Sequence, residues 1–204
     1  MERAHREDIS MLKQEARKIA RSRIAKMSDA EREWASDSII DAVSSLDLFK
    51  QAKKIFVYLG TSTEPDTHEI VGLALAMEKT VAVPRVRGDE MDAISITPFT
   101  DFRTNKWGIL EPAKGYRLDE VDLAIIPLVA FDGLKRVGHG KGYYDKFLST
   151  HPCKKLGLAF DCQSVEGLQC DSFDVPLDLL VTEKRIVTGS RKTTENKFGR
   201  EICE

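Results

Sequence analysis

Lys54-Ile55-Phe56-Val57-Tyr58-Leu59-Gly60 is a run of β-branched and aromatic residues that ends at a glycine. Such a run is typical of a buried strand. A helical pattern follows at residues 67–78, and a second strand-like run follows at residues 80–84. Because two strands joined through a helix form a parallel pair with a right-handed crossover, this region predicts the centre of a parallel sheet.

Strand and helix patterns alternate along the rest of the chain. Further strands are predicted at residues 93–97 (an edge strand), 121–126, 155–160, 179–182 and 185–187 (another edge), and helices at 8–26, 29–46 and 143–149. Residues 98–114 read mostly as loop. The alternation predicts a single α/β domain over residues 1–187, with three layers (α/β/α) and a mostly parallel, Rossmann-like sheet. The polar tail, residues 188–204, has no core-building pattern and is expected to be flexible.

Composition excludes several classes of protein. Of the 204 residues, 42% are hydrophobic and 31% are charged, which is the balance of a soluble globular domain. The net charge of -2 provides no general attraction for nucleic acid. No run approaches the roughly 18 apolar residues of a membrane span, and the first residues are too charged for a signal peptide. We therefore expect a cytoplasmic protein without a nucleic-acid or membrane partner. A monomer is expected as well, although no sequence pattern determines the oligomeric state.

The cysteines show no metal-binding pattern. Cys153, Cys162, Cys170 and Cys203 form no C-x-x-C pair and have no histidine at zinc-finger spacing. Reduced thiols are the favoured interpretation, with a bridge between Cys162 and Cys170 as the alternative.

A second stretch, Arg136-Val137-Gly138-His139-Gly140-Lys141-Gly142-Tyr143-Tyr144-Asp145, is a basic loop with glycines at alternate positions. Glycine lets the backbone approach a ligand closely and turn its N–H groups toward it. Arg136 and Lys141, both expected on an exposed loop, add positive charge, and Asp145 adds a carboxylate near a predicted helix start. The spacing fits neither a Walker A loop nor G-x-G-x-x-G. The combination suits a polyphosphate with its metal ion.

Other candidate positions lie outside this loop. Lys13 and Arg17 are four residues apart, so they project from one face of the first predicted helix. They form either a solvated basic face or a phosphate clamp. The loops after Leu59, Ile126 and Phe160 are predicted at the carboxyl ends of strands, where ligands collect in such sheets.

The loop resembles the hallmark of the 5-formyltetrahydrofolate cyclo-ligase family, R-[LV]-G-x-G-x-G-Y-Y-D-x-x-L. The resemblance continues in order over Lys13-x-x-x-Arg17, Glu64-Pro65-Asp66-Thr67, Pro84-Arg85-Val86, Trp107-Gly108-Ile109-Leu110-Glu111-Pro112 and Asp174-Val175-Pro176-Leu177-Asp178. These matches span nearly the whole chain apart from the tail. One departure is the segment between Asp132 and Arg136, which is one residue shorter than is usual in the family.

The resemblance implies ATP as co-substrate, Mg²⁺, and 5-formyltetrahydrofolate, with or without a polyglutamate tail, as substrate. For ATP it implies Lys13, Arg17, Arg136, Val137, Gly138, His139, Gly140, Lys141, Gly142, Tyr143 and Tyr144. For the folate it implies Leu59 and Glu64, with Trp107 and Tyr144 as aromatic surface, and for the metal Asp145 and Asp174. We assign Lys141 and Arg136 to the transferring phosphoryl group, as the catalytic residues.

The resemblance also implies a reaction. ATP phosphorylates the formyl oxygen, N10 attacks the activated carbon, and loss of phosphate gives 5,10-methenyltetrahydrofolate. Another Mg-ATP-dependent kinase or ligase of small molecules on the same scaffold is the alternative, and a non-catalytic protein that binds folate or nucleotide is a third.

Several of these residues also have a purely structural interpretation. Trp107 and Tyr144 fit a core position, and Asp174 fits a turn or cap. Glu64 fits a solvated loop carboxylate, and His139 an exposed loop position.

Overall fold

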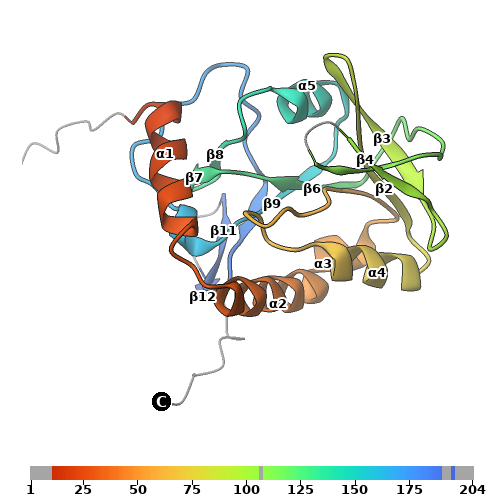
Figure 1. The fold of residues 1–204 in the computed structure, drawn as a ribbon, viewed down its shortest axis with the longest axis horizontal. Coiled ribbons are helices and arrows are strands. Elements are labelled where there is room, and N and C mark those ends of the chain that lie inside the picture. The colour runs from red at the N-terminus through yellow and green to blue at the C-terminus, as the bar shows by residue number, and fades with distance from the viewer. Residues whose placement is uncertain (1–10, 106–107, 190–193, 196–204) are drawn as a thin grey trace, which may run out of the picture.

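A mixed sheet of eight strands runs through the middle of the protein in the order β12-β11-β10-β9-β6-β1-β2-β3 (Figure 1). The computed structural model describes residues 11–105, 108–189 and 194–195. The strands of this sheet are β1 (Lys54–Val57), β2 (Thr80–Arg87), β3 (Glu90–Ile96), β6 (Leu123–Pro127), β9 (Lys154–Leu158), β10 (Leu179–Val181), β11 (Arg185–Thr188) and β12 (Thr194–Glu195).

The strands from β10 to β2 run parallel to their neighbours, and the strands at both ends are antiparallel. The predicted parallel pair is confirmed, because β1 and β2 pair in register from Lys54 opposite Thr80. The predicted mostly parallel α/β sheet is confirmed with it. β3 is an edge strand, as expected.

Helices cover both faces of the sheet (Figure 1). α2 (Asp29–Ser45), α3 (Asp47–Gln51) and α4 (His68–Ala76) lie on one face, and α5 (Tyr143–Thr150) lies on the other. Successive residues of β1 serve these two layers, since Ile55 and Val57 pack in the cluster with α2 and α4 while Phe56 packs with Phe147 of α5. No helix among the described residues is long and apolar enough to cross a membrane.

The first helix, α1 (Lys13–Ile24), packs at the end of the molecule against a small hairpin of β7 (Ala130–Asp132) and β8 (Lys135–Val137). Ala16 and Ala20 are fully buried there, next to Val129 and Val137. Small side chains let the helix approach the hairpin closely. The hairpin turn is short, because Asp132 pairs with Lys135 and leaves two residues between them.

The sequence placed the start of α1 too early, at residue 8. The described chain is not yet helical at Met11, whose N–H donates to Gly167 O at 2.8 Å and whose carbonyl accepts from Gln169 N at 3.0 Å. This strand-like pairing with a distant segment holds Met11 out of the helix. By contrast, the predicted capping box of α2 is confirmed, with the Ser28 and Glu31 side chains each bonded to the other's backbone N–H.

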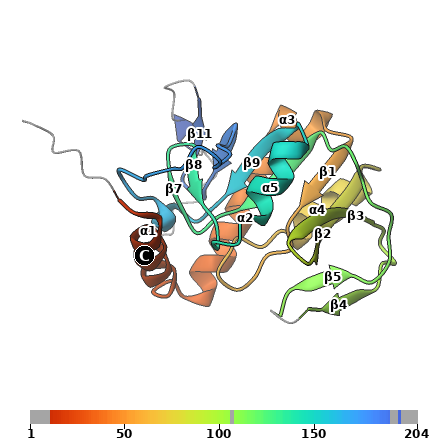
Figure 2. The same ribbon diagram turned by 90° about the horizontal axis from the view of Figure 1, so that it is seen from above.

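Residues 98–114 are mostly loop among the described positions, as predicted, but two short strands that the sequence did not predict interrupt the loop. These strands are β4 (Phe102–Thr104) and β5 (Leu110–Pro112), which form an antiparallel hairpin. The hairpin lies beyond β2 and β3, at the opposite end of the sheet from α1 (Figure 2). All three residues of β4 are exposed, so the sequence shows no hydrophobic alternation there from which a strand could be predicted.

Both ends of the large sheet are covered by further backbone pairing. At one end, residues 116–118 bond to β3 through Ser95 N to Tyr116 O at 2.9 Å and Leu118 N to Ala93 O at 2.8 Å. At the other end, β12 pairs with β11, so β11 is not the predicted edge. The tail expected to be flexible from residue 188 therefore contributes Thr188 and residues 194–195 to the sheet, and its other residues lie outside the described part. Cys153, Cys162 and Cys170 are free thiols, as predicted, and Cys203 also lies outside it.

The loop after β1 is tied closed by buried hydrogen bonds. The Thr67 hydroxyl donates to Tyr58 O at 2.5 Å and accepts from Gly60 N at 3.2 Å. The Tyr58 hydroxyl donates to Pro65 O at 2.9 Å, and burial raises the pKa of this phenol well above its ordinary value. The loop packs so tightly that a Cβ on Gly60 would lie 2.7 Å from Pro65 O.

Replacing Gly60 with alanine should therefore destabilise the protein. We expect Gly60→Ala to lower the free energy of unfolding by about 1–3 kcal/mol, because backbone atoms have to move to admit the new methyl group. Gly72→Ala is the matched control, since a Cβ on Gly72 meets nothing within 4 Å in α4. It should raise stability by about 0.5–1 kcal/mol. Urea denaturation of both variants measures the difference, and equal stabilities would contradict the tight loop.

Candidate active site

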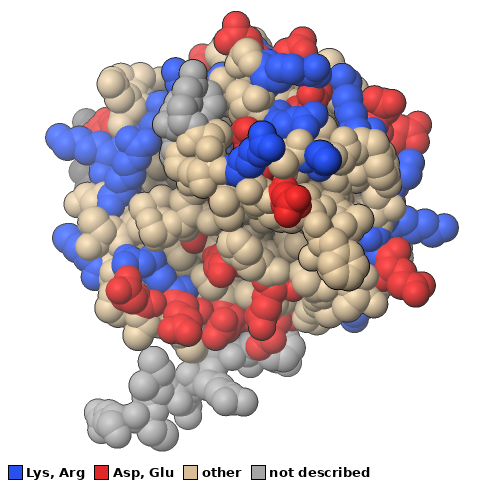
Figure 3. Space-filling view, turned by 45° about the vertical axis from the view of Figure 1, so that its right-hand side comes forward, with Lys and Arg blue, Asp and Glu red and all other residues tan. Residues whose placement is uncertain are grey.

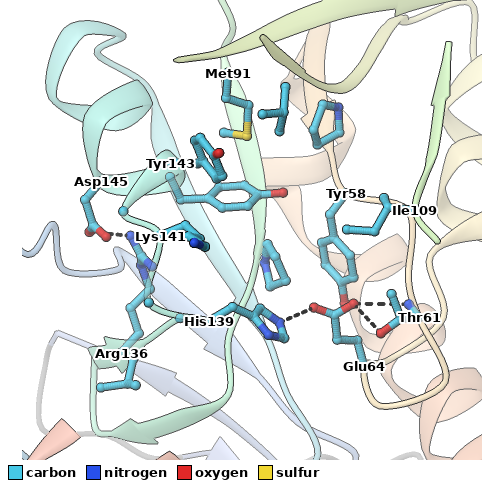
Figure 4. Close-up of a pocket in the computed structure, with 18 of the residues that line it drawn as sticks. Tyr58, Thr61, Glu64, Met91, Ile109, Arg136, His139, Lys141, Tyr143 and Asp145 are labelled. Atoms are coloured by element: carbon cyan, nitrogen blue, oxygen red, sulfur yellow. Dashed lines mark hydrogen bonds and ion pairs between the residues drawn. The ribbon is translucent and has the colours of Figure 1, made fainter. Parts of the chain in front are cut away.

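A cavity of about 550 Å³ opens beside the carboxyl ends of β1 and β6 (Figure 4). It is lined by nearly all the residues that the sequence pointed to: Lys13, Arg17, Leu59, Glu64, Arg136, Val137, Gly138, His139, Gly140, Lys141, Gly142, Tyr143, Tyr144, Asp145 and Asp174. Trp107 lies outside the described residues. The structure therefore brings α1, the loop after β1, the glycine loop and the segment before β10 together at one place.

The loop after Phe160 does not reach the cavity, in contrast to the expectation. It forms the short 3-10 helix η1 (Asp161–Gln163), which packs against α1. The Gln163 amide donates to Leu128 O at 2.8 Å and Val129 O at 2.9 Å. This loop therefore supports the chain that leads into the β7–β8 hairpin, because its polar group is used for a buried contact.

The glycine loop has the backbone of an anion-binding loop. Gly140 and Gly142 have φ values of 101° and 70°, which residues with a side chain rarely adopt. Within the described chain, no backbone N–H from 138 to 142 donates a hydrogen bond. Arg17 fixes the loop to α1, because its Nε donates to Gly138 O at 2.8 Å. Free N–H groups next to a guanidinium are suited to bind phosphate oxygens.

Arg136 is buried, whereas the sequence had suggested a position on an exposed loop. It lies in β8, and its Nη2 donates to Asp145 Oδ1 at 2.6 Å. The same Oδ1 accepts the N–H of Val175 at 3.1 Å, so the segment before β10 is held against α5. Both bonds use one carboxylate oxygen. Arg136 Nε is buried without a hydrogen-bond partner among the described residues.

Lys13 pairs with two carboxylates of the segment before β10. Its Nζ lies 2.5 Å from Asp174 Oδ2 and 2.6 Å from Asp171 Oδ2. Burial alone would lower the pKa of Lys13, but the hydrogen bonds to Asp171 and Asp174 outweigh it and raise that pKa above its ordinary value. Sequence reasoning missed Asp171, although its spacing of three residues from Asp174 indicates a turn that brings both carboxylates together.

Asp145 and Asp174 both line the cavity, and the N–H of Val175, the residue after Asp174, donates to Asp145 Oδ1. No group of three or more His, Cys, Asp or Glu side chains arranged to hold a metal occurs in the described part of the chain. A pair of carboxylates is nevertheless what Mg²⁺ takes from a protein when substrate phosphates and water supply its other ligands. The pair thus fits a metal that is shared with a phosphate ligand.

Glu64 lies on the opposite wall and is 8% exposed. Its Oε2 accepts Thr61 N at 3.1 Å and Thr61 Oγ1 at 2.8 Å, and its Oε1 lies 3.0 Å from His139 Nε2 (Figure 4). Burial, with the nearby charge of Glu64 as a second cause, raises the pKa of the Tyr144 phenol well above its ordinary value. Glu64 is therefore a fixed carboxylate in the cavity and not a solvated loop residue.

The apolar part of the cavity was mostly missed by sequence reasoning. It comprises Tyr58, Pro84, Val86, Met91, Ile109, Leu110 and Phe173. Pro84, Val86, Ile109 and Leu110 stand in motifs noted in the sequence, but only the tertiary structure joins them with the other three. Glu111, in the same motif as Ile109 and Leu110, holds the wall together, because its Oε1 accepts Val86 N at 3.0 Å and Asn105 Nδ2 at 2.9 Å.

The charge of the surface is mixed. Figure 3 shows Lys, Arg, Asp and Glu interspersed over one face, with a row of Asp and Glu along its lower edge. The net charge is -2. The electrostatic attraction for an anionic ligand therefore comes from Arg17 and Lys141 at the cavity itself, since Lys13 is paired with Asp171 and Asp174.

Comparisons with known proteins agree on one family. The model of the 5-formyltetrahydrofolate cyclo-ligase family matches residues 9–183. A protein of Caenorhabditis elegans named "Probable 5-formyltetrahydrofolate cyclo-ligase" is 32% identical over 195 residues, which cover 86% of this chain and 94% of that protein. The 5-formyltetrahydrofolate cyclo-ligase of Haemophilus influenzae is 31% identical over 182 residues, with coverage of 83% and 95%.

A solved structure is also similar. The NMR structure of Aquifex aeolicus 5,10-methenyltetrahydrofolate synthetase superposes with a TM-score of 0.76 at 34% sequence identity. The superposition covers 95% of this chain and 97% of that one.

The buried ion pair of Arg136 predicts a difference between the two basic residues of the glycine loop. Arg136→Met should lower the free energy of unfolding by about 3 kcal/mol, because Asp145 loses its partner in a poorly solvated place. Lys141 is exposed, so Lys141→Met should change stability by less than about 0.5 kcal/mol. Urea denaturation followed by circular dichroism gives both values. Equal losses in the two variants would show that the pair does not stabilise the fold.

Proposed function

Because the chain belongs to the 5-formyltetrahydrofolate cyclo-ligase family, we propose that it converts 5-formyltetrahydrofolate to 5,10-methenyltetrahydrofolate with consumption of ATP. One observation carries the proposal beyond the family name. A single cavity joins a glycine loop with unbonded N–H groups to a fixed carboxylate and an apolar wall. The first suits a polyphosphate, and the other two suit a flat heterocycle with N–H donors at its edge.

The phosphate end of the cavity is assigned to ATP. The N–H groups of residues 138–142 donate to no acceptor in the described chain, so they are available to phosphate oxygens. Lys141 is exposed at the cavity and free to approach the transferring phosphoryl group. Arg17 and Lys13 add charge from α1. Charge-assisted bonds to phosphate are stronger than neutral ones, which favours these residue types.

The metal is assigned to Asp145 and Asp174. Arg136 and Val175 occupy Oδ1 of Asp145, and neither bond uses Oδ2. A hard cation prefers such carboxylate oxygens together with phosphate oxygens and water. Bound there, Mg²⁺ would neutralise charge on the phosphates. Arg136, first assigned to the phosphoryl group itself, is better placed to hold Asp145 in position, because its guanidinium is buried in that pair.

The folate is assigned to the side of the cavity that carries Glu64. The carboxylate accepts N–H donors of the pterin edge, and Leu59 lies at the same loop. Tyr58, Met91 and Ile109 provide apolar surface for the ring system (Figure 4). Tyr144 stays a neutral phenol because of the raised pKa, so it adds no charge next to Glu64.

The reaction then needs alignment more than covalent chemistry from the protein. ATP phosphorylates the formyl oxygen, N10 attacks the activated carbon, and phosphate leaves as the five-membered ring closes. Catalysis of phosphoryl transfer consists mainly of positioning and charge stabilisation. Glu64 and the glycine loop hold the two substrates from opposite walls, and Lys141 supplies charge where the phosphoryl group moves. No side chain acts as a nucleophile.

The proposal predicts two products from one mixture. Purified protein with Mg²⁺, ATP and 5-formyltetrahydrofolate should form ADP and the methenyl chromophore in equal amounts. Lys141→Met should lower kcat/KM by about 100-fold, as loss of one preorganised charged donor does. Lys154→Met is the matched control, because Lys154 is exposed at the amino end of β9. ADP without methenyl product would indicate another ATP-dependent enzyme, and binding without either product would indicate a non-catalytic protein.

The metal assignment predicts a changed magnesium titration. Asp145→Asn keeps an oxygen for Arg136 but removes the charge, so the Mg²⁺ concentration for half-maximal rate should rise by at least about 10-fold. Asp119→Asn, at a side chain 84% exposed, should leave that concentration unchanged. An unaltered titration in the Asp145 variant would show that this carboxylate serves only its contacts with Arg136 and Val175.

A further inference from the structure

One hydrogen bond crosses the cavity from the glycine loop to the loop after β1. His139 Nε2 lies 3.0 Å from Glu64 Oε1, and Figure 4 shows the two side chains pointing toward each other from opposite walls. The His139 side chain is 52% exposed, whereas that of Glu64 is 7% exposed. The histidine is therefore the solvent-exposed partner of the bond, and the carboxylate is the buried partner.

The bonding of Glu64 leaves room for one more donor. A carboxylate has about four acceptor positions on its two oxygens. Thr61 N and Thr61 Oγ1 take the two positions of Oε2, and His139 takes one position of Oε1. One position of Oε1 thus stays open for a ligand N–H while His139 remains bonded. A ligand on Glu64 and the His139 contact are therefore compatible.

The glycine loop is anchored on both sides of the cavity. Toward α1, Arg17 Nε holds Gly138 O at 2.8 Å. Toward the loop after β1, the Nε2 of His139 contacts Oε1 of Glu64. His139 stands between Gly138 and Gly140, which restrict the backbone little, so its side-chain contact helps to set where the loop lies.

We propose that His139 is a positioning residue that couples the two substrates of the proposed reaction. Phosphates bound by the glycine loop hold His139 in its contact with Glu64, and this bond orients the carboxylate for the pterin edge. A folate held by Glu64 in turn fixes His139 and with it the phosphate-binding loop. Coupling of this kind is reciprocal, so each ligand tightens the binding of the other by the same factor. The inference rests on the proposed function for the identity of the ligands.

Calorimetric titration tests the coupling directly. The dissociation constant of a non-hydrolysable ATP analogue with Mg²⁺ is measured with and without saturating 5-formyltetrahydrofolate. In the wild-type protein, bound folate should lower the dissociation constant of the analogue by at least about 5-fold. In His139→Ala this factor should fall toward one, while the affinity for the analogue alone changes by less than about 2-fold, since the N–H groups and Arg17 remain.

A conservative variant separates the hydrogen bond from the mere presence of a side chain. His139→Gln places an amide N–H donor at similar reach, so it should restore most of the coupling that His139→Ala loses. It should also reverse most of the rise in the KM for folate that His139→Ala causes. Equal melting temperatures of all three proteins would confirm that the variants are folded. The histidine is half exposed, so no large change in melting temperature is expected.

The outcomes are distinct. Wild-type coupling in His139→Ala, or a His139→Gln protein that behaves like the alanine variant, would overturn the coupling role while the enzyme still turns over. Failure of the wild-type protein to bind either ligand would overturn the proposed function and the coupling with it. A loss of coupling in His139→Ala that the glutamine variant reverses would support the inference.

Discussion

A parallel sheet has to be covered on both faces, and this requirement determines where the chemistry of the protein lies. Ile55 and Val57 of β1 pack toward α2 and α4, and Phe56 packs toward α5. Polar groups therefore have no place along the strands and collect where the strands end. The cavity forms at that edge, between the loop after β1 and the loop before α5. The burial of hydrophobic side chains thus places the polar side chains of the site at this edge of the sheet.

Ion pairs and charged hydrogen bonds then connect segments that are far apart in the chain. Arg17 joins α1 to the glycine loop, Arg136 and Asp145 join β8 to α5, and Lys13 joins α1 to Asp174. Each of these groups is one that the proposed reaction also needs. The same charges therefore hold these segments together and lie where a phosphate ligand would bind.

Much of this arrangement was predictable from the sequence, and the reasons for the rest are physical. Local signals predicted β1, the capping box of α2 and the helix after the glycine loop, because each depends on residues close in sequence. The burial of Arg136 was not predictable, since it depends on tertiary packing that sets β8 beside α5, where Arg136 pairs with Asp145. The β4–β5 hairpin lacks alternation, and the Glu64 to His139 bond joins residues 75 positions apart. No local pattern records such contacts.

The pairing at the two ends of the large sheet has a consequence for how copies of this chain meet one another. A strand with unpaired N–H and C=O groups is a template on which another chain can extend the sheet. Residues 116–118 bond to the outer side of β3, and β12 pairs with the outer side of β11. What remains outermost at the β11 end is a strand of two residues, too short to guide a neighbour into register. The fold thereby protects its longest strands from intermolecular β-pairing at high concentration.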